Sequence, residues 1–162
     1  MSNCCEPSAA CVDARTACPS CARGAVRVDV QTVKALLTES AMQRVGSGPY
    51  QFCANPSCAT VYFAGASQVF TVADVRVPVW QKLPFGSRTI CYCFGENEAD
   101  IRAEIEQTGR SEAVRRVREH IAAGRCACEL RNPRGNCCLG DVSAAVKRAE
   151  GARQGIRNVE ER

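Results

Sequence analysis

The sequence ICYCFG at residues 90–95 opens the part of the chain that decides the fold. About thirty helix-forming residues follow it, and then come RCACEL at residues 125–130 and NCCLGD at residues 136–141. Two cysteine-containing loops, 91–94 (the near loop) and 126–138 (the far loop), are therefore expected to face each other across a helical hairpin. In a reducing cytosol, thiolates gathered in this way hold a metal centre more often than they form disulfides.

The cysteine spacing favours an iron–sulfur centre. A [2Fe-2S] cluster needs two thiolates on each iron, and Cys91 and Cys93 of the near loop can direct both sulfurs to one iron. The far loop offers four candidates for the second iron: Cys126, Cys128, Cys137 and Cys138. Because neighbouring cysteines point apart, we expect one ligand from each pair and favour Cys128 and Cys138. Cys138 directly precedes the helix expected to start at Asp141, whose positive end stabilises a negative cluster. The other member of each pair stays an open alternative.

A second group of cysteines lies earlier in the chain. Cys18 and Cys21 form a Cys-x-x-Cys turn, and Cys53 and Cys58 form a second pair with four residues between them. Together they predict a Cys4 zinc site, which is structural because all four positions around the ion are filled by protein. Chelation of the zinc should then unfold this small half. The alternative is two separate turns with buried free thiols.

The predicted fold class is α+β. A zinc-ribbon-like β module is expected at residues 17–85, with strands at 26–30, 60–63, 68–72 and 75–80 and a short helix at 32–37. A helical module is expected at residues 86–148. Its first helix, 98–107, is capped by Asn97 and ended by Gly109, and two more follow at 111–120 and 142–148. The charged tail at 149–162 is expected to fray from residue 151 onwards.

Residues 1–16 contain Cys4, Cys5 and Cys11 but no periodic apolar pattern, so this arm is expected to be disordered. These thiols either bind a soft ion such as Cu(I) or Hg(II), or belong to a mobile tail without a specific role.

Composition limits the classes of function. The chain has 162 residues, thirteen cysteines and a net charge of +4, without the concentrated basic patch that nucleic acid binding needs. No secretory signal or membrane span is expected, which predicts a cytoplasmic protein without membrane insertion. The single histidine, His120, is expected to be a surface or half-buried residue and not a ligand. No catalytic residue constellation is evident, so we do not expect an enzyme.

The near-loop motif, the helical spacer and the Cys-Cys-Leu-Gly-Asp-Val motif at 137–142 resemble the [2Fe-2S] fold of bacterioferritin-associated ferredoxin (BFD). With the region from Cys18 to Cys58 added, the chain resembles the N-terminal half of CopZ-type copper chaperones over about residues 18–147. This resemblance implies one zinc ion and one [2Fe-2S] cluster held in a BFD-like module. Full-length CopZ proteins continue into a copper-binding domain with a Met-x-Cys-x-x-Cys loop, which residues 148–162 do not contain.

Two functions follow as hypotheses. The first is a metallochaperone-like protein that handles copper or another soft metal, with the cluster as a one-electron centre, Cu⁺ as cargo and an acceptor protein such as a metal-transporting ATPase. The surplus thiols favour this hypothesis. The alternative is a BFD-like ferredoxin that transfers electrons to a redox partner.

Overall fold

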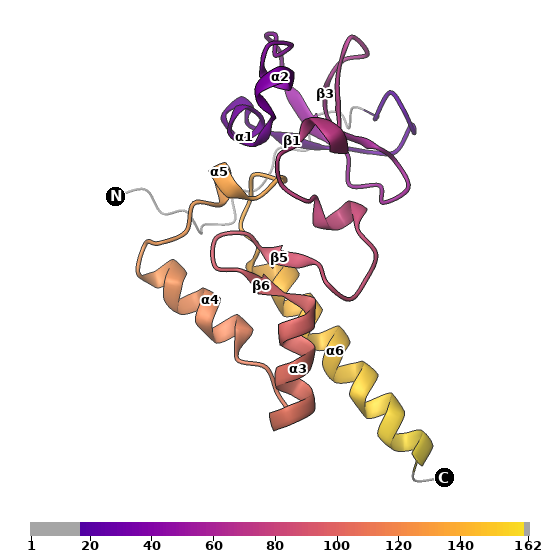
Figure 1. Ribbon diagram of the computed structural model, residues 1–162, viewed down its shortest axis with the longest axis vertical. Coiled ribbons are helices and arrows are strands. Elements are labelled where there is room, and N and C mark those ends of the chain that lie inside the picture. Colours follow the sequence, from indigo (N-terminus) through magenta and orange to yellow (C-terminus); the bar gives the residue numbers. More distant parts are fainter. Residues whose placement is uncertain (1–16, 161–162) are drawn as a thin grey trace.

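The computed structural model describes residues 17–160, with side chains to residue 155, and consists of two halves arranged along its longest axis (Figure 1). The N-terminal half is a four-stranded antiparallel sheet with two short helices. The C-terminal half contains the longer helices and a two-stranded ribbon. This mixture of helices and a small antiparallel sheet confirms the α+β class. Cys4, Cys5 and Cys11 lie outside the described residues, so the soft-metal arm stays a prediction.

The sheet of the N-terminal half follows the chain order. Its strands are β1 (Val26–Val28), β2 (Tyr50–Phe52), β3 (Thr60–Ala64) and β4 (Gln68–Thr71), each paired antiparallel with the next. Helix α1 (Val30–Leu36) follows β1 because the Asp29 side chain accepts a hydrogen bond from Gln31 N, which caps the helix. This cap also ends β1 at Val28, two residues earlier than expected. Helix α2 (Glu39–Met42) is capped by Thr38.

The expected strand at 75–80 is wrong. Val75 forms one isolated bridge with Leu37, and the chain then continues into the 3-10 helix η2 (Trp80–Lys82). Two local features explain the difference. The 3-10 helix η1 (Val72–Asp74) redirects the chain after β4, since the Asp74 carboxylate accepts hydrogen bonds from Thr71. Pro78 then lacks the N–H that a further sheet bond would need.

The first two helices of the C-terminal half lie where the sequence predicts them. Helix α3 (Glu98–Thr108) starts at the Asn97 cap, whose side-chain oxygen accepts from Asp100 N at 2.9 Å. It ends at Gly109, which has a φ of 90° that favours glycine. Helix α4 (Ala113–Ala122) follows after a short turn. The sequence did not predict the ribbon of β5 (Thr89–Cys91) and β6 (Glu96–Asn97), nor the short helix α5 (Cys128–Arg131).

Helix α6 (Leu139–Glu160) corrects the predictions of a helix at 142–148 and of a fraying tail. It begins directly after Cys138, so Asp141 lies in its first turn and does not start it. Helices α3 and α4 pack along α6, and Val142 and Ala145 in its N-terminal part are buried. The Arg153 guanidinium also donates a hydrogen bond to the carbonyl of Ile105, which holds α6 against the end of α3.

A partly buried group of ion pairs around Arg116 joins three elements of the C-terminal half. Glu96 of β6 is 7% exposed, and both its carboxylate oxygens accept from the Arg116 guanidinium of α4, at 2.7 and 2.8 Å. Arg116 also donates to Glu104 of α3 at 2.5 Å. These ion pairs therefore fix the ribbon that carries Cys91 relative to both helices.

We expect Arg116→Ala to lower the free energy of unfolding by about 1.5–3 kcal/mol, because Glu96 would keep a buried charge without its partner. Urea unfolding followed by circular dichroism measures the change. The matched control is the neighbouring Arg115→Ala, whose two ion pairs with Glu112 and Glu119 lie at the surface and should contribute much less to stability. Equal effects of the two variants would contradict the prediction.

Candidate metal centres

The first group of cysteines gathers at one end of the sheet. Cys18 and Cys21 lie in a turn closed by the hydrogen bond from Ala22 N to Cys18 O at 2.8 Å. Cys53 follows β2 directly and Cys58 lies just before β3, so the β2–β3 connection carries the second pair. The hairpin therefore brings together two pairs that lie more than thirty residues apart in the sequence.

The geometry of this group fits a tetrahedral ion. The four sulfurs of Cys18, Cys21, Cys53 and Cys58 all lie within 4.8 Å of one another. The Cys21 and Cys53 sulfurs are 3.7 Å apart. Four thiolates at the usual zinc–sulfur distance of 2.3 Å would lie about 3.8 Å apart along each edge of the tetrahedron. Three of the four cysteines are buried, together with Phe63. The two turns are therefore not separate, since all four sulfurs meet at one place.

The charge state of the group is adjusted by its neighbours. A hydrogen bond with the Asn55 side chain lowers the pKa of Cys21 to about 6, whereas burial raises the pKa of Cys53 to about 12. Lys82 contributes a nearby positive charge and donates from Nζ to the Asn55 carbonyl at 2.6 Å. Since a metal ion binds thiolates, binding here would release the protons that the buried thiols retain.

The structure also brings the near and far loops together. Cys91 ends β5, Cys93 lies in the turn before β6, Cys128 begins α5 and Cys138 directly precedes α6. Three of these cysteines are buried and Cys93 is half-buried. The Cys93 and Cys128 sulfurs are 3.9 Å apart, and the Cys138 thiol interacts with both Cys91 and Cys128. The sulfur contacts therefore run from one loop to the other.

These shared contacts shift the thiol pKa values in opposite directions. A hydrogen bond with Cys138 lowers the pKa of Cys128 to about 3, and the same interaction raises the pKa of Cys138. A hydrogen bond with Cys128 likewise raises the pKa of Cys93, whose sulfur also accepts from Ala127 N at 3.4 Å. Such paired shifts indicate sulfurs crowded into one volume, where a cation would favour the thiolate form of all of them.

The two remaining far-loop cysteines differ from these four in burial. Cys126 and Cys137 are both half-buried, and the Cys137 thiol contributes a hydrogen bond to Cys128. Both cysteines lie close to the four that are proposed as ligands. Their side chains are partly exposed to solvent.

The aromatic residues of the near loop have different contacts. The Tyr92 hydroxyl donates to Pro78 O at 2.5 Å and accepts from Trp80 N at 2.9 Å. The sequence carries no signal for these contacts. Phe94 stacks on His120 with ring centroids 4.1 Å apart, and His120 is half-buried as expected.

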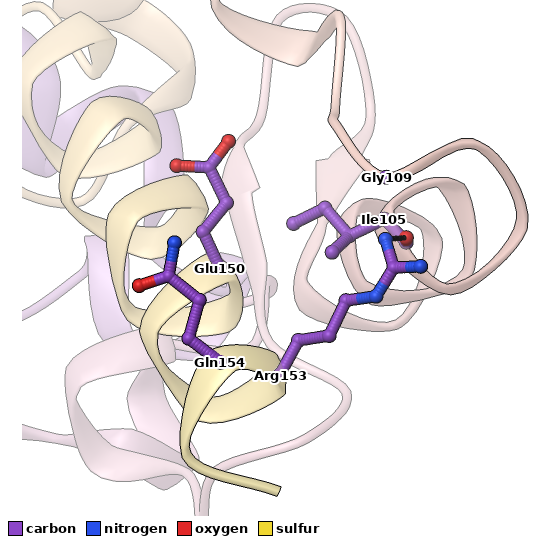
Figure 2. A pocket seen from close by; sticks show the side chains of 5 residues that line it. All are labelled: Ile105, Gly109, Glu150, Arg153 and Gln154. Carbon is purple, nitrogen blue, oxygen red and sulfur yellow. Dashed lines mark hydrogen bonds between the residues drawn. The ribbon is translucent and has the colours of Figure 1, made fainter. Parts of the chain in front are cut away.

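A separate cavity of about 420 Å³ lies between α3 and the C-terminal part of α6 (Figure 2). It is lined by Ile105, Gly109, Glu150, Arg153 and Gln154. Figure 2 shows Arg153 extending across it towards Ile105 and Gly109. None of these residues is a cysteine, so the cavity is separate from both cysteine groups.

Comparisons with known proteins agree with this arrangement. Residues 15–76 match the family model of the CopZ zinc binding domain. The structure is similar to the X-ray structure of the CopZ N-terminal domain from Archaeoglobus fulgidus, with a TM-score of 0.65 and 29% sequence identity. That similarity covers 80% of this chain and 96% of the archaeal chain. A comparison with curated proteins finds no match.

Residues 15–76 are therefore similar to a zinc binding domain, and the four gathered cysteines of this half form a candidate metal site. Within residues 17–160, the helices are all too short or too polar to cross a membrane.

We expect Cys53→Ser to lower the zinc content well below one ion per chain and to destabilise the N-terminal sheet, because a serine hydroxyl does not replace a thiolate ligand. Metal analysis and thermal unfolding measure the two effects. Ser57→Ala is the control, since Ser57 is exposed in the same connection. An unchanged zinc content in Cys53→Ser would show that this group does not bind the ion.

Proposed function

We propose that this protein is a metallochaperone-like protein that contains a structural zinc ion and a [2Fe-2S] cluster and that handles copper or another soft metal ion. The observation that supports this most is the gathering of eight cysteines into two groups of four, each built from segments distant in the sequence. Cysteines gathered without disulfides are typical of metal sites in reducing compartments.

Zinc is proposed for the N-terminal group, with Cys18, Cys21, Cys53 and Cys58 as ligands. The mutual distances of the four sulfurs suit tetrahedral coordination. All four positions would be occupied by protein, so the ion would stabilise the sheet and would not bind substrate. The match to a zinc-binding family model over residues 15–76 supports the choice of metal.

The [2Fe-2S] cluster is proposed for Cys91, Cys93, Cys128 and Cys138. Four thiolates suffice for such a cluster, and the near and far loops each supply two. The burial of Cys128 and Cys138, compared with the half-buried Cys126 and Cys137, supports the choice within each far-loop pair. When bound, the cluster supplies one-electron oxidation and reduction. The chain itself provides an apolar surrounding of Ile90, Ile101 and Val142.

Copper or a similar soft ion is proposed as the cargo. Thiolates prefer Cu(I), and the half-buried Cys126 and Cys137 offer soft ligands beside the proposed cluster. The similarity to a CopZ N-terminal domain supports this choice. An acceptor protein, such as a metal-transporting ATPase, would receive the ion.

A cysteine-to-serine series tests the cluster. In protein prepared without air, we expect Cys128→Ser and Cys138→Ser to lose the visible absorption and the bound iron and sulfide. Cys126→Ser and Cys137→Ser are the matched controls in the same loop and should retain them. Bleaching by Cys126→Ser or Cys137→Ser instead would move the ligand assignment to that member of the pair. A colourless wild-type protein would exclude the cluster.

Titration with Cu(I) tests the cargo. We expect thiolate-to-copper absorption in the ultraviolet to rise with added Cu(I) in the cluster-loaded protein, and to be reduced in the double variant Cys126→Ser/Cys137→Ser. A response in wild type that the double variant retains in full would place the copper ligands elsewhere. Indifference to copper, together with a reversible reduction potential and saturable binding to a redox partner, would favour the ferredoxin alternative.

A further inference from the structure

The far loop rests directly on the N-terminal half. Helix α5, which begins at Cys128, packs against α1 at the boundary between the two halves (Figure 1). The two elements are about a hundred residues apart in the sequence. The loop that carries half of the proposed cluster ligands is therefore supported by the zinc-binding domain and by the helices of its own half.

Two buried hydroxyl groups of the zinc-binding domain make this support specific. Thr32 of α1 donates from Oγ1 to the carbonyl of Glu129 at 2.6 Å, one residue after Cys128. Tyr62 of β3 donates from its hydroxyl to the carbonyl of Pro133 at 2.7 Å, in the turn between Cys128 and Cys138. Both side chains are fully buried. Burial also raises the pKa of Tyr62, so its hydroxyl remains a donor.

The turn held by Tyr62 and Thr32 is also cross-linked within itself. Asn132 is buried, and its side chain donates to Asn136 O at 2.7 Å and accepts from Arg134 N at 3.1 Å. Gly135 approaches α1 so closely that a Cβ there would lie 2.9 Å from Thr32 Oγ1. The far loop therefore has little freedom to shift relative to the zinc-binding domain.

The near loop is attached to the same half. The Tyr92 hydroxyl, between Cys91 and Cys93, bonds to the backbone of Pro78 and Trp80. Lys82 in the same segment bonds to Asn55, which lies between the two cysteines of the β2–β3 connection. Both loops of the proposed cluster site thus contact the half of the molecule that carries the first group of cysteines.

A metal site divided between two loops binds more weakly when binding must also order those loops, because their conformational entropy is lost at that moment. We propose that Tyr62 and Thr32 are positioning residues that hold the far loop in its metal-binding conformation, so that an intact zinc-binding domain supports binding at the second cysteine group. This inference rests on the proposed function only in taking that second metal centre to be a [2Fe-2S] cluster.

The variants Tyr62→Phe and Thr32→Val test the inference, because each removes one hydroxyl and changes the side-chain volume little. Tyr50→Phe is the matched control. Tyr50 is an equally buried tyrosine of the same sheet, but its hydroxyl bonds to Gly46 and Gln68 within the N-terminal half. All three variants are made in the full chain with its zinc.

The first measurement is peptide-level hydrogen–deuterium exchange in zinc-loaded, cluster-free protein. Loss of a buried hydrogen bond should accelerate exchange in residues 126–138 about fivefold in Tyr62→Phe and Thr32→Val and leave it unchanged in Tyr50→Phe. The second measurement is the loss of visible absorption under an iron chelator, which should be faster by a similar factor in the same two variants only.

The outcomes separate this inference from the proposed function. Equal exchange of residues 126–138 in Tyr62→Phe, Thr32→Val and Tyr50→Phe would overturn the positioning role, even in protein that binds the cluster. Faster exchange in a protein that binds no cluster would uphold the positioning role and exclude the proposed iron–sulfur centre. If Tyr62→Phe does not fold, Thr32→Val alone decides between these results.

Discussion

The structure depends on the gathering of four thiols at one end of a small sheet. Cys18, Cys21, Cys53 and Cys58 bring their sulfurs within 4.8 Å of one another, and most of this group is buried. Thiolates packed this closely repel one another in a low-dielectric surrounding, so the arrangement is stable only with shared protons or a bound cation. A four-stranded sheet of short strands has a limited core of its own, which makes such a cross-link important for its stability.

The C-terminal half also gathers cysteine sulfurs, but helices and loops hold them in place of a sheet. Its sulfurs lie on two loops, and helices α3, α4 and α6 fix the bases of these loops through apolar packing and the Glu96–Arg116 ion pair. The outer part of the far loop, however, is hydrogen-bonded to Thr32 and Tyr62 of the other half. The two cysteine groups are therefore parts of one connected structure, although they are far apart in the sequence.

Local signals explain why much of the fold was predictable. Asn97 and Gly109 set the ends of α3, because capping needs only a side-chain oxygen at one end and a residue tolerant of positive φ at the other. The strand prediction at 75–80 failed because η1 turns the chain away from the sheet before Pro78. The end of α6 was also mistaken, since its continuation past Gly151 depends on contacts with α3 that no local pattern contains.

By itself, the sequence determined the spacing of the cysteine pairs, the α+β class and the two ends of α3. These follow from spacing and periodicity, which are local properties of the chain. Only the tertiary structure decided that Cys128 and Cys138 are buried while Cys126 and Cys137 are half-buried. It also decided that Tyr62 and Thr32 support the far loop, because burial and hydrogen bonds between distant segments arise only when the two halves pack together.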